Sequence, residues 1–204
     1  MMQQYQGIRR TLPPETILLF RLGDFYEMFF EDAKVASSIL NVALTQRNGM
    51  PMCGIPFHAS EGYVRKLLQA GRRVAVCDQV SEPQPGKIVQ REITQILSPG
   101  TVSDLQMLES GRNNFVAAIC PEAKRGYGFA YMDLSTGEFR LTELADAVEL
   151  ADELARVKPA EVMVDEAVAD QFGHLPGLIR RDGYAFLWDQ AYHTLLKNFG
   201  VQAL

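Results

Sequence analysis

The chain has 204 residues and a formal net charge of −5, which argues against a protein that binds nucleic acid through bulk charge. Hydrophobic residues make up 47% of the sequence, enough for a real core and too many for general disorder. We expect a cytoplasmic protein without membrane contact, because the sequence has no bilayer-length apolar run and no signal pattern. The three cysteines are far apart and form no metal-binding spacing, which predicts buried free thiols.

The first part of the chain alternates between strand-like and helix-like patterns. The polar stretch 1–10 is expected to be helical, and a strand is expected over 16–22. Gly23-Asp24 is interpreted as a strand-to-helix turn, followed by a helix over about 25–40. The chain therefore places an aromatic residue and a carboxylate at or near a helix start.

The segments that follow complete a mixed unit. Asn48-Gly49 predicts a hairpin-like turn, and 52–58 is too rich in Gly and Pro for regular structure. A helix is expected over 60–70, and strands over 73–80 and 89–97. Strands with intervening helices predict an α/β or α+β layer for this half. Its charge is nearly balanced, whereas the second half is acidic, which favours the first half for any phosphate contact.

The pattern of the second half predicts an antiparallel meander followed by alternating helices and strands. The expected strands cover 115–120, 128–134, 138–144 and 161–164, and the expected helices cover 146–156 and 188–199. Three antiparallel strands followed by a helix, a strand and a helix is how ribonuclease-H-like domains begin. We place the domain boundary in the polar connector between the halves, where the charge balance changes sign.

Phe25 and Glu27 allow two interpretations. By spacing alone, Phe25 starts an apolar helical stripe through Phe29 and Ala33, which predicts a core residue. Asp24 and Glu27 match a capping box, so Glu27 could serve only the helix backbone. Alternatively, both side chains are exposed and contact DNA. Periodicity does not separate these interpretations.

The second interpretation has a physical basis. An aromatic wedge pushed between base steps unstacks them and kinks the duplex, typically from the minor groove. Unstacking costs least where pairing is already poor, so a wedge discriminates mismatches without reading sequence. A carboxylate beside phosphates makes sense if it accepts a base N–H, or is protonated and donates to a base nitrogen. Phe25 and Glu27 would then form a probe for defective base pairs.

A metal-dependent nuclease is an alternative of a different class. Asp133 lies on a central strand of the expected meander, with Glu138 and Asp165 on other strands. In ribonuclease-H-like nucleases, carboxylates on adjacent strands hold two Mg²⁺ ions. Solvated or turn-capping carboxylates are the simpler interpretation, because Glu138 directly follows the Ser135-Thr136-Gly137 turn. The sequence contains no Walker A motif.

Several motifs in register resemble the N-terminal part of the MutS family of bacterial DNA mismatch-repair sensors. They are MMQQY at 1–5, GDFYE at 23–27, M-x-G-I-P-x-H-A at 52–59, VAVCDQ at 74–79, SPGT at 98–101, DLSTG at 133–137 and NFG at 198–200. The resemblance covers essentially the whole chain. It implies a mixed α/β (α+β) fold, with a mixed-sheet mismatch-binding domain over 1–104, a linker over 105–112, and an incomplete ribonuclease-H-like connector domain over 113–204.

The resemblance also assigns roles to residues. In the family a Phe-x-Glu pair contacts the mismatch, so Phe25 is expected to stack on the mispaired base from the minor groove and Glu27 to hydrogen-bond to it. Five further residues match family positions that line the DNA near this site: Leu22, Asp24, Arg47, Met52 and Gln79. Taken alone, Arg47 could reach a phosphate or be solvated, and an isolated arginine favours the solvated side chain.

The implied partners are mismatched double-stranded DNA, the MutL protein and, in the full-length family, a second copy in a homodimer. ATP and Mg²⁺ act in the full-length family, but we expect no catalytic residue, metal site or cofactor in this stretch. The connector domain would couple the mismatch-binding domain to clamp and ATPase domains outside the chain. The implied location is the bacterial cytoplasm, in association with the nucleoid. A pure interaction module remains a third possibility.

Overall fold

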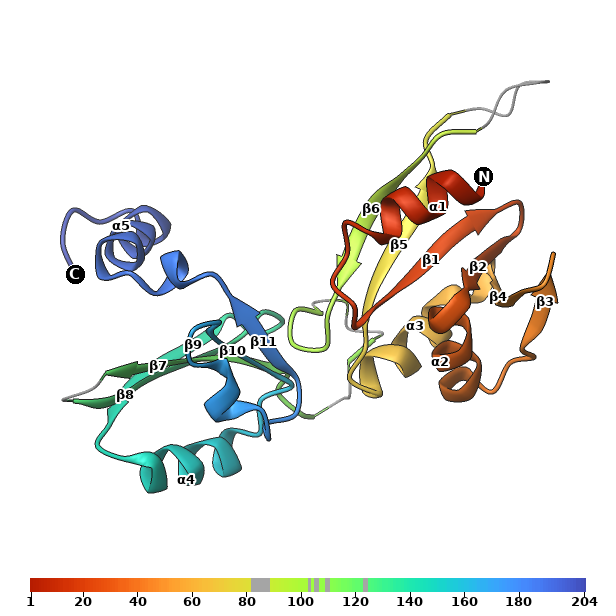
Figure 1. Ribbon diagram of the computed structural model, residues 1–204. Helices are drawn as coiled ribbons and strands as arrows, with labels where there is room; N and C mark the ends of the chain where they lie inside the picture. Colours follow the sequence, from red (N-terminus) through yellow and green to blue (C-terminus); the bar gives the residue numbers. More distant parts are fainter. Residues whose placement is uncertain (82–88, 103, 105–106, 109–110, 123–124) are drawn as a thin grey trace. The chain divides into compact units, whose positions relative to one another are not determined.

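The computed structural model describes residues 1–81, 89–102, 104, 107–108, 111–122 and 125–204. Residues 82–88, which join the strands expected over 73–80 and 89–97, and part of the expected linker lie outside the described residues. The chain divides into two compact units, Met1–Ser110 and Gly111–Leu204, and each has its own sheet (Figure 1). Both units combine helices with a mixed sheet, which confirms the predicted mixed α/β fold.

The first unit is a six-stranded sheet with helices on both faces. Its elements are α1 (Met2–Arg9), β1 (Thr16–Leu22), β2 (Phe25–Phe29), α2 (Phe30–Leu40), β3 (Thr45–Arg47), β4 (Met50–Pro56), η1 (Phe57–Ala59), α3 (Ser60–Gln69), β5 (Arg73–Gln79) and β6 (Arg91–Leu97). The strand order is β3-β4-β2-β1-β5-β6, and β1 and β5 are parallel neighbours. Helices α2 and α3 pack on one face of this sheet and α1 packs on the other (Figure 1).

The segment expected to begin a helix is a strand, so the predicted helix over 25–40 is wrong in its first turns. Leu22 pairs with Phe25, and Gly23-Asp24 is the two-residue loop of an antiparallel hairpin. Gly23 has φ +59°, the left-handed conformation that such a loop favours at its first position. The helix α2 begins only at Phe30, so Asp24 and Glu27 do not form a capping box.

The segment 52–58 is also regular, contrary to expectation. Most of it belongs to β4, which pairs with β2 on one side and with β3 on the other. Pro56 is the last residue of the strand, where its missing N–H costs little. The predicted hairpin turn at Asn48-Gly49 is confirmed, because both residues have positive φ and connect β3 to β4.

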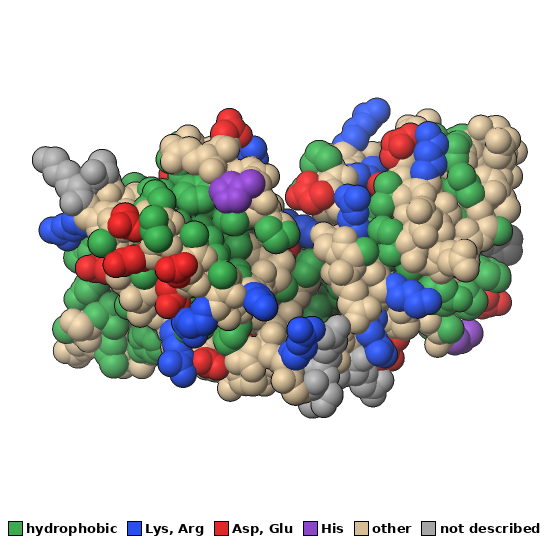
Figure 2. Space-filling view, turned by 90° about the horizontal axis from the view of Figure 1, so that it is seen from below, with side chains coloured by type: hydrophobic (Ala, Val, Ile, Leu, Met, Phe, Trp, Pro, Cys, Tyr) green, Lys and Arg blue, Asp and Glu red, His purple; other side chains and the backbone are tan. Residues whose placement is uncertain are grey.

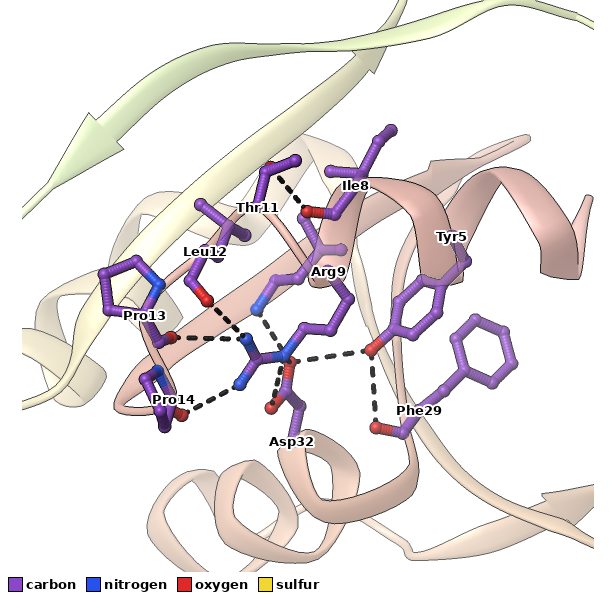
Figure 3. A network of polar contacts seen from close by, with 10 residues as sticks. Tyr5, Ile8, Arg9, Thr11, Leu12, Pro13, Pro14, Phe29 and Asp32 are labelled. Atoms are coloured by element: carbon purple, nitrogen blue, oxygen red, sulfur yellow. Dashed lines mark hydrogen bonds and ion pairs between the residues drawn. The ribbon is translucent and has the colours of Figure 1, made fainter.

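A buried polar network fastens α1 to the sheet (Figure 3). The Asp32 carboxylate accepts a hydrogen bond of 3.1 Å from the backbone N–H of Leu18 and pairs with Arg9 Nε at 3.1 Å. The Tyr5 hydroxyl lies 3.4 Å from the carbonyl oxygen of Phe29. Burial raises the pKa of Tyr5 and also the pKa of Asp32, although Leu18 and Arg9 oppose the rise at Asp32. This network fixes the position of α1 over one part of the sheet face.

The second unit has a five-stranded sheet in the order β11-β10-β7-β8-β9. Its elements are β7 (Phe115–Glu122), β8 (Gly126–Asp133), β9 (Glu138–Leu144), α4 (Ala147–Val157), β10 (Glu161–Asp165), η2 (Ala169–Phe172), β11 (Leu178–Arg181), η3 (Gly183–Phe186) and α5 (Trp188–Phe199). The meander β7-β8-β9 and the helix and strand after it are as predicted, whereas β11 was not predicted. Helix α4 packs on the sheet through Leu150 and Val157, whereas α5 has no buried residue.

Figure 2 shows acidic side chains gathered on the second unit, seen from the side on which α4 lies. Helix α4 carries Glu149, Asp152 and Glu153, in agreement with the acidic balance of this half. The helices in the described part of the chain are all too short or too polar to cross a membrane.

Candidate nucleic-acid interface

Strand register brings most of the predicted DNA-binding residues onto one face of the first sheet. Side chains of β2 alternate, so Phe25 and Glu27 share the face of Phe29, which is the face that α1 covers in part. Leu22 on β1 is the direct partner of Phe25, and Met52 on β4 is the direct partner of Phe29. Direct partners in a sheet point to the same side, so these side chains lie on one surface.

The remaining predicted residues extend this surface or flank it. Gln79 lies two positions after Cys77, which packs in the core under α1, so the two share a face. Asp24 lies in the hairpin loop and is exposed, and its carbonyl oxygen accepts a hydrogen bond of 2.9 Å from Phe57 N–H. Arg47 lies on the edge strand β3, beside the hairpin turn. Six predicted side chains thus share a face, and Asp24 borders it.

Phe25 is exposed over 49% of its surface, so the interpretation as a core residue is wrong. Helix α1 and its neighbours enclose Phe20 and Phe29, which are fully buried on the same face. The cover ends before the hairpin loop, and Phe25, the first residue of β2, is therefore left in solvent. A large aromatic side chain in this position is available to a partner.

Glu27 is paired with Arg47 and has no role at a helix terminus. Arg47 Nη1 donates to Glu27 Oε2 over 2.8 Å. The Glu27 side chain is 14% exposed and that of Arg47 is 44% exposed. The ion pair crosses from β2 to β3, over the intervening strand β4.

Gly54 supports this part of the surface, and sequence reasoning assigned it no role. It is the direct partner of Glu27 on β4. A methyl group added at Gly54 would lie 3.7 Å from Cγ of Glu27 and 3.9 Å from Cδ1 of Phe25. These are ordinary van der Waals distances, so both side chains lie close against the strand at Gly54. The signal for it was present, since Gly54 belongs to the M-x-G-I-P-x-H-A motif.

A second network, also missed from sequence, holds the hairpin from the opposite face. The Tyr26 hydroxyl donates to Asp78 over 2.7 Å. Arg21 places its guanidinium 3.3 Å from the ring centre of Phe57, a cation–π contact. Burial, followed by the contact with Asp78, raises the pKa of Tyr26 to about 12. These contacts fix the strand end that carries Phe25.

Asp133 of the nuclease alternative is fully buried at the end of β8. Its carboxylate accepts hydrogen bonds from Asn114 N–H at 2.9 Å, and from the N–H and hydroxyl groups of Ser135 at 2.8 and 2.6 Å. Burial alone would raise the pKa of Asp133, but these hydrogen bonds outweigh it and lower the pKa. One oxygen binds the turn after β8 and the other binds the backbone just before β7, so both serve a structural role.

The other predicted carboxylates also have local partners. Glu138 pairs with Arg140 at 2.6 Å, and Asp165 accepts a hydrogen bond from Ala167 N–H at 2.9 Å. Among the described residues, no three His, Cys, Asp or Glu side chains are grouped so that they could hold a metal ion. The three cysteines are free thiols, as predicted, but Cys120 is exposed, so its predicted burial is wrong.

Comparison with known proteins identifies the class to which this fold and surface belong. Residues 1–106 match MutS domain I, and residues 114–204 match MutS domain II. The chain belongs to the MutS family. The DNA mismatch repair protein MutS of Pelotomaculum thermopropionicum is 43% identical to it over 214 residues, and that of Treponema denticola is 38% identical over 225 residues. These alignments cover 98% and 100% of this chain, which spans 25% of each relative's length.

Proposed function

We propose that the first unit recognises mismatched double-stranded DNA in mismatch repair, with Phe25 as the wedge and Glu27 as the contact to the mispaired base. The exposure of Phe25 carries the proposal. An aromatic side chain that is half exposed at the start of a largely buried strand adds little to the core, whereas it is placed to enter a base step. The printed names of both relatives support the same process.

The surroundings of Phe25 suit a minor-groove contact. Leu22 and Met52 are partly buried apolar side chains on the same face, and they would contact the bent minor groove beside Phe25. Gln79 and Arg47 offer polar and cationic groups at the margins of this face. Asp24 borders the wedge through the hairpin loop, next to the groove that Phe25 would enter. The surface carries few cations, so phosphate contacts would supply modest affinity and the wedge would supply discrimination.

For the second unit we propose the connector role. It would transmit the state of the first unit to clamp and ATPase domains outside this chain and would offer a surface to MutL. The family match to MutS domain II over 114–204 supports this role, and we propose a linker over 105–112 between a first domain over 1–104 and a second over 113–204. Homodimer formation in a longer protein and a cytoplasmic, nucleoid-associated location complete the proposal. Pull-down of MutL by this chain, compared with the first unit alone, tests the partner.

Fluorescence anisotropy tests the main proposal. The chain is titrated into labelled duplexes that differ only by a G·T mismatch in place of a G·C pair. Phe25→Ala should abolish the preference for the mismatch and preserve the weak binding to both duplexes that phosphates supply. Phe139→Ala is the matched control, because Phe139 is an exposed phenylalanine of the second unit. A preference that survives Phe25→Ala would rule out the wedge.

A further inference from the structure

The ion pair of Glu27 and Arg47 joins two residues that the proposed function assigns to DNA. Nη1 of Arg47 lies 2.8 Å from Oε2 of Glu27, and the carboxylate is the more enclosed of the two groups. Glu27 lies on the same face of β2 as Phe25, two positions along the strand. Each charged group therefore already has a partner in the absence of DNA.

A phosphate would compete with Glu27 for Arg47. The planar guanidinium binds a carboxylate or a phosphate with the same N–H donors. While Arg47 holds Glu27, the pair is neutral and contributes little to phosphate binding. If Arg47 left Glu27 without a replacement, an enclosed carboxylate would face the negative field of the duplex alone. The exchange is thus favourable only if Glu27 gains a new hydrogen-bond partner.

We propose that this ion pair is a latch, which frees Arg47 for a phosphate only where Glu27 finds a base. On a matched duplex the wedge does not enter, Glu27 stays out of reach of the bases, and Arg47 stays with Glu27. At a mismatch Phe25 enters the stack and carries Glu27 toward the base edge, because both project from one face of the same strand. The inference rests on the proposed function, and it makes Arg47 a specificity-determining residue.

The salt dependence of binding tests the latch. The slope of log K against log salt reports the number of phosphates neutralised, at roughly 0.9 per contact. The chain should show a slope steeper by about one contact on the mismatched duplex than on the matched duplex. Arg47→Ala should lower the slope by about one contact on the mismatched duplex and leave the slope on the matched duplex unchanged. If Arg47 instead contacted a phosphate on every duplex, Arg47→Ala would lower both slopes.

Glu27→Gln provides the opposite perturbation. Without the charged partner Arg47 is always available, so matched-duplex affinity should rise about two- to fivefold and its slope should steepen by about one contact. Adding Arg47→Ala to Glu27→Gln should remove this gain. Lys34→Ala is the control, because it removes the cation of an ion pair with Glu31 at 2.6 Å on α2, on the other face of the sheet. It should change neither slope.

The outcomes separate the latch from the proposed function. If Phe25→Ala abolishes mismatch preference but Arg47→Ala lowers both slopes equally, the latch is wrong and the wedge stands. If Phe25→Ala leaves the preference unchanged, both are wrong. Absence of measurable binding to either duplex at the lowest salt would also overturn both for this chain. Slopes that differ between the duplexes and become equal in Arg47→Ala would support the latch.

Discussion

Tyr26 and Asp78 are joined by a hydrogen bond of 2.7 Å that reaches across strand β1. Thr94 on β6 donates to the other carboxylate oxygen of Asp78, also over 2.7 Å. Tyr26 is the neighbour of Phe25 in the chain and lies on the opposite face of β2. The exposed aromatic residue is therefore carried by a strand end that is tied to the centre of the sheet.

Removing the Tyr26 hydroxyl should loosen this strand end. Tyr26→Phe should lower the free energy of unfolding by about 1.5–3 kcal/mol, because the hydrogen bond to a charged group is lost. Urea denaturation measures the change. Tyr63→Phe is the control and should cost less, since no hydrogen bond of its hydroxyl is found within the described part of the chain. Equal costs would mean that the contact to Asp78 contributes nothing.

The Tyr26 hydroxyl should lose its proton at a higher pH than an ordinary tyrosine does. The folded-state pKa of Tyr26 is about 12, above the ordinary value of 10.0, because of burial and the contact with Asp78. The neutral hydroxyl therefore stabilises the fold fully below pH 10.0, and this stability is lost as the pH rises through about 12. Difference absorbance of tyrosinate, compared between the chain and Tyr26→Phe, should show one late-titrating tyrosine removed. A removed transition near the ordinary value would contradict the expectation.

Two phenylalanines of β2 should differ sharply in their contribution to stability. Phe29 is fully buried beneath α1, so Phe29→Ala should cost about 3–5 kcal/mol. Phe25 is half exposed, and Phe25→Ala should change stability by less than about 1 kcal/mol. Thermal and urea denaturation of the two variants provide the comparison. A large loss on Phe25→Ala would mean that its ring packs in the core after all.

Asp32 should make stability depend on pH. Its pKa is raised above 3.8 by burial, although Leu18 N–H and Arg9 stabilise the carboxylate. The contribution of this group to the unfolding free energy is therefore greatest below 3.8 and declines as the pH rises through the folded-state pKa. The stability difference between the chain and Asp32→Asn should shrink from acidic toward neutral pH. Urea denaturation over a pH series measures this stability difference. A difference that grows with pH would contradict the raised pKa of Asp32.

Asp133 should act as a structural residue of the second unit. Asp133→Asn removes the acceptor of at least one buried hydrogen bond and should cost about 1–3 kcal/mol. Its pKa is lowered, so the carboxylate stabilises the fold above its ordinary value of 3.8, and this contribution is lost as the pH falls through the folded-state pKa. Asp152→Asn on the exposed surface of α4 is the control. Cleavage of RNA–DNA hybrids with Mg²⁺ or Mn²⁺ that disappears in Asp133→Asn would instead favour the nuclease alternative.

Many elements could be predicted because they carry their own signals. Helix α3, strand β5 and the meander of the second unit have a clear period and turn residues at their ends. Strand β2 does not, because positions 25 and 29 share a face both in a helix and in a strand. The neighbouring strands β1 and β4 decide the matter by pairing with both edges of the segment. Strand β4 was missed for a different reason. Its Gly and Pro residues disfavour a strand in the local pattern, and its pairing with β2 and β3 outweighs them.

By itself, the sequence determined which side chains could form the site. The motifs singled out Phe25 and Glu27, and the resemblance to the MutS family implied that Arg47 and Met52 lie near them. Only the tertiary structure decided that Phe25 is exposed, because exposure depends on where α1 stops covering the sheet face. It also decided that Glu27 meets Arg47, 20 residues further along the chain, since β2, β4 and β3 lie side by side. Burial and charge pairing are set by neighbours in space, and the local pattern of a strand does not contain them.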